Sequence, residues 1–159
     1  MKLTHLDEAG RARMVDVSSK PVSERTAVAE GRVRMSAEAF AQVADQAIAK
    51  GDVLTVAEVA GTLAAKRTGD LIPLCHPLGL DLVQVEARLE PALPGVQIRA
   101  TARATGRTGV EMEALTAVTV ACLTVYDMVK AVDRQMSISE VRLVSKTGGT
   151  RGDWQQSGS

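Results

Sequence analysis

Hydrophobic and polar residues alternate in several stretches of the chain, and this alternation predicts β-strands. Over residues 25–35, alanine, valine and methionine lie on one side and charged residues on the other, with Gly31 at a position that suits a bulge. Residues 83–89 and 96–102 alternate on either side of a turn rich in proline, which predicts an antiparallel hairpin. A last strand is expected over about 137–145, although its alternation slips in the middle.

Between the first strand and the hairpin, apolar residues recur at helical spacing in two consecutive segments. Ser36 is placed to cap the first helix, which we expect to end at Lys50–Gly51. Asp52 is placed to cap the second helix, which we expect to end between Lys66 and Gly69. Lys50 and Lys66 would then both lie at helix C-termini, where a cation complements the helix dipole.

The longest apolar segment predicts one long helix after the hairpin. Thr108 and Glu111 have the spacing of a capping box that would open it. Its apolar positions recur with gaps of three and four residues from Leu115 to Val132, as in a narrow apolar seam. The order of elements is therefore strand, helix pair, strand, strand, helix, strand. This order predicts an α+β fold of the ferredoxin-like, split βαβ type, an antiparallel sheet with helices packed on one face.

The chain has 159 residues, the length of one domain, and no repeat or change of composition divides it. We therefore expect a single domain over residues 1–159. Met14–Ser18 can add a short edge strand. We expect a mobile N-terminal segment over about residues 1–12. The C-terminal tail, about 146–159, contains four glycines and two serines, so we expect it to be mobile until something binds it.

The charges and the aromatic content narrow the classes of function. Nineteen basic and nineteen acidic residues cancel, which argues against a general nucleic-acid-binding surface. Aromatic residues make up only 2% of the chain, so it lacks a platform for stacking single-stranded nucleic acid. No apolar run has the length of a signal-peptide core or a membrane span, so we expect a cytoplasmic protein without membrane contact. The two cysteines are expected to stay reduced there.

The segment 66–77 brings together two cations, a thiol and an imidazole in a stretch whose prolines prevent a continuous helix. His76 suits a hydrogen-bond donor or a proton shuttle, and equally a histidine satisfied by the loop backbone. Neighbouring residues such as Cys75 and His76 rarely bind one ion, and the sequence has no spaced Cys/His set, so no metal site is expected. Lys50 and Lys66 can bind a polyanion, although their predicted positions favour the simpler role at helix ends.

The long helix carries the acids best suited to proton transfer. Glu111 already has a structural role in the predicted capping box, whereas Glu113 is the better functional candidate. Asp127 and Lys130 are spaced to pair as a solvated bridge, or, if partly buried, to act as a general acid/base couple tuned by burial and charge. Glu113 and Asp127 are fourteen residues apart, about 21 Å along a helix. A small substrate could contact both only in a site between subunits.

Several segments of this chain, in this order, resemble those of one known family. They are Met14–Ser18, Ala65–Thr68, Leu71–Leu78, Thr108–Thr116 and Tyr126–Met128. Along essentially its whole length the chain resembles the cyclic pyranopterin monophosphate synthase family, also called the molybdenum cofactor biosynthesis protein C family. The resemblance implies a ferredoxin-like subunit in a hexamer built as a trimer of dimers, with active sites at dimer interfaces.

The resemblance also implies a reaction and its residues. Cyclised dihydro-GTP is rearranged to cyclic pyranopterin monophosphate, and pyrophosphate is released. No redox cofactor is implied, and the sequence does not require the Mg²⁺ that can accompany a triphosphate. Asp127 matches the family's catalytic acid/base residue, with Lys130 and Lys66 beside it. The matched substrate-binding positions are Leu74, Cys75, His76, Met112 and Glu113, and the matched cations are Lys50, Arg25 and Lys146.

One departure from the family pattern lies in the tail. The family usually has Lys-x-Gly-Gly-Lys-Ser-Gly, whereas this chain has Thr150 in place of the second lysine and Arg151 one position later. Lys146 remains a candidate phosphate ligand. The contribution of the rest of the tail stays open.

Two other functions compete with this interpretation. A non-catalytic nucleotide-binding regulatory module would account for the lysines and the tail, but it leaves Asp127, Lys130 and His76 without roles. A nucleotide pyrophosphohydrolase usually needs a dense carboxylate cluster for Mg²⁺, which the sequence does not offer. Measuring pyrophosphate release from GTP and from cyclised dihydro-GTP separates the three functions.

Overall fold

The computed structural model describes residues 5–157, which form five strands and four helices. In chain order these elements are β1 (Ser23–Arg34), α1 (Ala37–Ala44), α2 (Val53–Lys66), α3 (Thr68–Leu71), β2 (Leu82–Glu90), β3 (Gly95–Gly106), α4 (Glu111–Val129), β4 (Ser137–Thr147) and β5 (Trp154–Gln155). The predicted mobile ends include residues 1–4 and 158–159, which lie outside the described part of the chain. Mobility of the remaining end residues stays a prediction.

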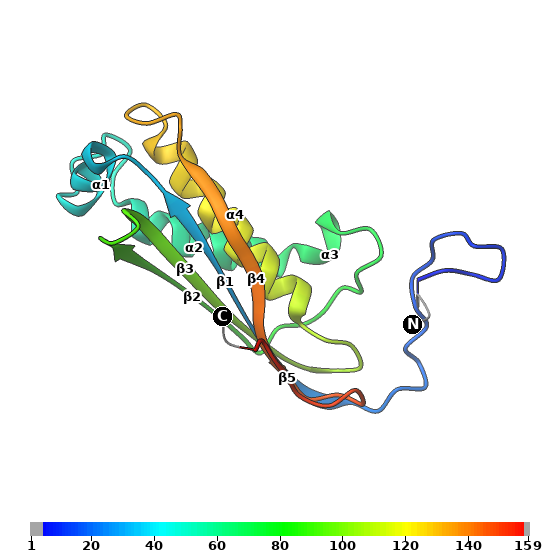
Figure 1. Ribbon diagram of the computed structural model, residues 1–159. Helices are drawn as coiled ribbons and strands as arrows, with labels where there is room; N and C mark the ends of the chain where they lie inside the picture. Colours follow the sequence, from blue (N-terminus) through cyan, green and yellow to red (C-terminus); the bar gives the residue numbers. More distant parts are fainter. Residues whose placement is uncertain (1–4, 158–159) are drawn as a thin grey trace.

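The strands form one antiparallel sheet with the order β2-β3-β1-β4-β5. β1 lies in the middle, pairs with β3 along its whole length and with β4 on its other side. α2 precedes β2, α4 connects β3 to β4, and both helices pack against the same face of the sheet (Figure 1). The predicted ferredoxin-like α+β fold is confirmed, and β5 adds a short strand at one edge.

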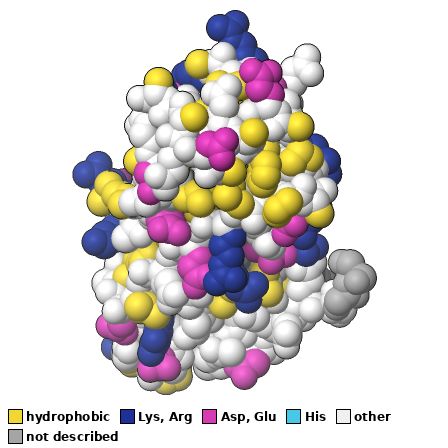
Figure 2. Space-filling model, turned by 90° about the vertical axis from the view of Figure 1, so that its left-hand side faces the viewer, with side chains coloured by type: hydrophobic (Ala, Val, Ile, Leu, Met, Phe, Trp, Pro, Cys, Tyr) yellow, Lys and Arg dark blue, Asp and Glu magenta, His cyan; other side chains and the backbone are white. Residues whose placement is uncertain are grey.

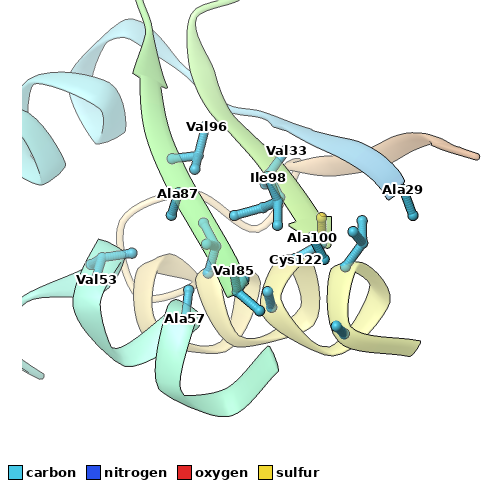
Figure 3. Close-up of a cluster of buried hydrophobic side chains, with 14 of the residues drawn as sticks. Ala29, Val33, Val53, Ala57, Val85, Ala87, Val96, Ile98, Ala100 and Cys122 are labelled. Atoms are coloured by element: carbon cyan, nitrogen blue, oxygen red, sulfur yellow. The ribbon is translucent and has the colours of Figure 1, made fainter. Parts of the chain in front are cut away.

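The core between sheet and helices is made of small and branched aliphatic side chains. Val33, Val96 and Ile98 are completely buried on the sheet face that the helices cover. Figure 3 shows these side chains pointing toward α2 and α4, which present Ala57 and Cys122 to the sheet. Because the side chains are short, the helices lie close to the sheet and leave little freedom for them to shift.

The contact between α2 and α4 is especially close. A methyl group added at Gly61 of α2 would come within 2.8 Å of the Ala117 carbonyl oxygen and 3.2 Å of the Ala121 methyl group. α4 is long and apolar enough to span a membrane by length and hydropathy alone. Its contacts with α2 and the sheet show instead that it is the central helix of a packed core.

The two short-range helix caps were predicted correctly, whereas the end of α1 was not. Ser36 Oγ accepts a hydrogen bond from the Ala39 amide, and Asp52 Oδ1 accepts one from the Thr55 amide, each at 3.1 Å. α1 ends at Ala44 because Gln46 adopts a left-handed backbone conformation (φ 54°). Lys50 therefore lies in a loop and not at a helix C-terminus.

The capping box predicted at the start of α4 is wrong. Val110 is the cap residue and no side chain bonds to the free amides there. The Glu111 carboxylate pairs instead with the Lys146 ammonium group from β4. An ion pair with a residue that is remote in sequence has replaced the local hydrogen bond.

Two further predictions about strands have opposite outcomes. The slip in the last strand is real: Glu140 has a φ of 52°, and the β1–β4 register shifts between Glu30 and Arg32, around Gly31. The edge strand predicted at Met14–Ser18 is not formed, because this segment makes no strand pairing in the described chain and its neighbourhood has only an isolated bridge from Leu6 to Ala12.

Candidate active site

A cavity of about 670 Å³ lies at the N-terminal end of α4. Its walls come from five parts of the chain: the N-terminal segment before β1, the start of β1, the loop after α3, the start of α4, and the end of β4 with the tail that follows. The predicted site residues that line it are Arg25, Leu74, Cys75, His76, Met112 and Lys146. Segments that lie far apart in the sequence therefore meet here.

The loop after α3 is folded back toward α4 by local contacts. Thr68, which is buried, donates from its hydroxyl group to the Ala65 carbonyl oxygen at 3.0 Å and continues the turn beyond α2. Gly69 packs against Pro77, since a methyl group at Gly69 would lie 3.2 Å from the Pro77 Cα. These contacts hold the segment between them at the cavity and place His76 in its wall.

The partly buried Cys75 and the buried Glu113 lie next to each other at the cavity. The Cys75 thiol lies 3.8 Å from Glu113 Oε1, and Glu113 is only 2% exposed. Burial raises the pKa of Glu113 above its usual value. Burial and the neighbouring Glu113 raise the pKa of Cys75 to about 11, so the thiol is protonated at neutral pH and suits hydrogen bonding better than nucleophilic attack.

Glu113 has an unused hydrogen-bonding atom. Its Oε2 is buried and has no partner within the described residues. A buried polar atom without a partner costs about 1–3 kcal/mol, which the rest of the fold must offset. Such an atom beside a cavity is well placed to bind a ligand group.

The cations around the cavity differ in how many hydrogen bonds and ion pairs they make with other protein groups. Arg25 is 7% exposed and donates to the carbonyl oxygens of Gly106 (3.1 Å) and Arg107 (3.3 Å). Lys146 is paired with Glu111, which also lines the cavity. The position of Glu111 in this site was not expected from the sequence, because its spacing from Thr108 matches a helix cap.

A second group of predicted residues lies at the other end of α4. Asp127 accepts hydrogen bonds from the ammonium groups of Lys50 (2.7 Å) and Lys130 (2.6 Å). Lys50 also donates to the Asp127 backbone carbonyl oxygen at 2.9 Å. The two lysines lower the pKa of Asp127 to about 2, so it is ionised at neutral pH. The expected Asp–Lys couple is therefore present, with Lys50 as a second partner.

Of the two arrangements that the spacing allowed, the solvated bridge is the one present. The Asp127 side chain is 54% exposed and those of Lys50 and Lys130 are 49% and 52% exposed. Asp127 lies in the last turn of α4, on its solvent-facing side, whereas Val125, Met128 and Val129 of the same turn are buried in the core. Its low pKa therefore comes from the two lysines, and not from a buried environment.

Lys66 belongs to neither group. It is exposed at the end of α2 and lines a separate groove with Asp81, Leu78 and Leu80. In a single chain, the predicted site residues are thus divided among three places. Residues 5–157 contain no cluster of three or more His, Cys, Asp or Glu side chains that could hold a metal ion.

Comparison with known proteins identifies the family of the chain. The model of the MoaC family matches residues 14–149. This chain belongs to the MoaC family. It is 60% identical over 153 residues, 96% of this chain and 93% of the relative, to the cyclic pyranopterin monophosphate synthase of Brucella ovis. It is also 60% identical over 155 residues, 98% of both chains, to the protein of the same name from Cereibacter sphaeroides.

Membership of the MoaC family confirms the resemblance found in the sequence. The matched region begins at Met14 and ends at Gly149, so it includes the segment before β1 and most of the cavity-lining tail. The family match does not include Arg151, which lies just beyond it. Lys20 and Arg151 line the cavity and were missed, because each looked like an ordinary exposed cation in a poorly structured segment.

Proposed function

We propose that this MoaC-family chain is a lyase, a cyclic pyranopterin monophosphate synthase of molybdenum cofactor biosynthesis. It would convert cyclised dihydro-GTP to cyclic pyranopterin monophosphate and release pyrophosphate. The observation that carries this proposal is 60% identity to synthases of that name over nearly their whole lengths. The reaction moves bonds and protons and leaves no net change of oxidation state, so we propose that it needs no redox cofactor.

The charge of the cavity supports a triphosphate substrate. Four cations line it, from Lys20, Arg25, Lys146 and Arg151, against one carboxylate, Glu111. Excess positive charge in a concave site attracts polyanions and stabilises phosphate groups by charge-assisted hydrogen bonds. His76, Cys75 and Glu113 lie on the same side and offer hydrogen-bonding groups for the guanine-derived ring.

The Asp127 group supports proton transfer. In the free subunit its carboxylate is a weak base, because two lysines stabilise its ionised form. A substrate phosphate that drew Lys50 or Lys130 toward itself would remove part of this stabilisation, and the pKa of Asp127 would rise. Substrate binding would thus make Asp127 a better proton acceptor at the moment when a proton must be moved.

The distance between the two groups supports an active site shared by two copies of the chain. Glu113 and Asp127 lie on opposite ends of one rigid helix, about 21 Å apart. Cavity residues of one copy would meet the Asp127 group and Lys66 of another copy. A trimer of dimers would create six such sites.

The surface of the chain supports association with further copies. On one face, hydrophobic side chains gather in a band while Lys and Arg side chains lie beside Asp and Glu side chains (Figure 2). On α2, Val56, Val59 and Leu63 recur at helical spacing and are 41%, 55% and 54% exposed. Leu123 on the neighbouring α4 is 56% exposed. Several exposed apolar side chains on neighbouring helices suit a protein interface.

The activity is tested by incubating the full chain with cyclised dihydro-GTP and, separately, with GTP, and measuring pyrophosphate and the pterin product. Product and pyrophosphate from the cyclised substrate alone would support the synthase. Pyrophosphate from GTP would support a pyrophosphohydrolase, and tight binding without turnover would support a regulatory module. Repeating the assay with EDTA tests whether Mg²⁺ accompanies the triphosphate.

The shared site is tested by mixing two inactive variants, Asp127→Asn and Glu113→Ala, under conditions that exchange subunits. If one site takes residues from two copies, some mixed dimers contain a site with neither substitution, and activity returns. If the mixture stays as inactive as its parents after exchange is shown, each site is built from one chain.

A further inference from the structure

We propose that Lys20 and Arg151 bind the terminal phosphates of the substrate, the two that leave together as pyrophosphate. This inference rests on the proposed function. The two residues come from opposite ends of the chain, Lys20 from the segment before β1 and Arg151 from the tail after β4. Both line the 670 Å³ cavity.

The other cavity cations are already engaged by the protein. Arg25 uses its Nε and one Nη to hold the carbonyl oxygens of Gly106 and Arg107, which fixes the end of β3. Lys146 is paired with Glu111. By contrast, no side-chain hydrogen bond or ion pair engages Lys20 or Arg151 within residues 5–157. Within the described part of the chain, the side-chain donors of these two cations are therefore not used by other side chains or by the backbone.

Local structure holds each of the two residues at the cavity. The Lys20 amide donates to the Val17 carbonyl oxygen at 3.0 Å, and this turn places the partly buried Lys20 in the cavity wall, which Val15 and Val17 also line. Because Pro21 follows directly, the backbone at Lys20 is restricted as the chain enters β1.

Arg151 is presented by a closed loop between β4 and β5. Asp153 Oδ1 accepts the Gly148 amide at 3.0 Å, and the Gly152 amide donates to the Gly149 carbonyl oxygen at 3.4 Å. Beyond the loop, β5 pairs with β4, and the Gln156 amide donates to the Val144 carbonyl oxygen. The loop is thus anchored at both ends, with Thr150 and Arg151 at the cavity.

The two cations would act on the step that releases pyrophosphate. A hydroxyl oxygen of the substrate forms a bond to the α-phosphorus, and its proton passes to a base. The bond from that phosphorus to the bridging oxygen breaks, and its electron pair leaves with the pyrophosphate. Lys20 and Arg151 would neutralise this developing negative charge, which is where fixed cations accelerate phosphoryl chemistry most.

The test uses pyrophosphate itself as the probe, with the full chain and the variants Lys20→Ala, Arg151→Ala and Arg151→Lys. Calorimetric titration should give pyrophosphate binding roughly tenfold or more weaker for each alanine variant, as expected for losing a hydrogen bond to a charged group. The lysine variant should retain part of the affinity, because it keeps the charge but loses the planar fork. Binding should also depend less on salt in the alanine variants.

Arg13→Ala and Arg134→Ala are the matched controls, since both residues are exposed cations outside the cavity lining. They should leave pyrophosphate affinity and melting temperature unchanged. If the pyrophosphate affinities of Lys20→Ala and Arg151→Ala lie within twofold of these controls, the inference is overturned. The proposed synthase function would not be affected by that result. A different outcome is also informative. If the alanine variants bind pyrophosphate more weakly but the unmodified chain does not convert cyclised dihydro-GTP, the phosphate site is supported and the proposed function is overturned.

Discussion

Replacing Gly149 by alanine should disable the cavity without unfolding the protein. Gly149 lines the cavity with a left-handed backbone (φ 88°), and it lies directly over Arg25. An added methyl group would come within 3.0 Å of the Arg25 Cζ and closer still to Nη1. Arg25 cannot easily move away, because it is held by its bonds to Gly106 and Arg107.

Two costs set the size of the effect. The left-handed conformation costs an alanine about 1–2 kcal/mol. Displacing Arg25 weakens hydrogen bonds that a charged donor makes, each worth about 1.5–3 kcal/mol. The two costs add to about 2.5–5 kcal/mol. Pairing of a two-residue strand such as β5 cannot offset this much, so we expect the tail to detach locally. The core does not depend on the tail, and the melting temperature should fall by less than about 3 °C.

Gly152→Ala is the control within the same loop. Gly152 also has a left-handed backbone (φ 77°), but a methyl group there would meet no atom within 4 Å. It therefore carries only the first cost. We expect Gly149→Ala to lower kcat/KM for cyclised dihydro-GTP at least tenfold more than Gly152→Ala, measured with the pyrophosphate assay. Equal activities for the two variants would refute the argument that the contact with Arg25 positions the tail.

Three further predictions follow from the charges. Glu113→Gln should raise the melting temperature relative to the unmodified protein, and the difference should grow as the pH rises above 4.5. The pKa of Glu113 is higher in the folded state than in the unfolded state, so its carboxyl group stabilises the fold at low pH. That contribution is lost as the pH rises through the folded-state pKa, whereas glutamine does not titrate. A melting-temperature difference that is independent of pH between 4.5 and 8 would contradict this. Asp127→Asn should abolish turnover but preserve binding of cyclised dihydro-GTP, as measured by calorimetry. Because the pKa of Asp127 is lowered to about 2 in the folded state, the unmodified chain should lose stability as the pH falls from 3.8 to about 2, and the asparagine variant should lack this loss. Turnover close to normal would contradict the catalytic role. Lys50→Ala should lower activity severely with little change in melting temperature, because its ion pair with Asp127 is half exposed; a stability loss with normal activity would show that Lys50 only supports the loop.

Local signals in the sequence predicted the parts of the fold that local interactions determine. Ser36 and Asp52 act within three residues of their partners, so the caps could be identified from spacing. The alternation was clearest in β1 and β3, because one side of each of these strands is buried along most of its length. The end of α1 could not be predicted, because Gln46 has a left-handed backbone conformation that is usually adopted by glycine.

The misassigned site residues depend on contacts between distant segments. Glu111 matched a capping box, but Lys146 of β4 lies close enough to take its carboxylate, and no local rule includes that strand. Lys20 and Arg151 lie in segments with weak patterns, and only their common cavity relates them. The resemblance identified Cys75, His76 and Met112 because they belong to continuous motifs, which a sequence displays directly.

The row of alanines along α4 has a consequence for how the protein can vary. Ala114, Ala117 and Ala121 are completely buried, and the last two touch Gly61 of α2. Because these alanines have no long side chains that could rearrange, α4 cannot easily shift or rotate against α2. The rigid helix therefore fixes the distance between the cavity and the Asp127 group. A larger residue at any of these positions would push α4 away from α2, so both the cavity end of the helix and the Asp127 group would move. Such changes should lower both stability and activity, because these positions are completely buried, even though they lie far from any reacting atom.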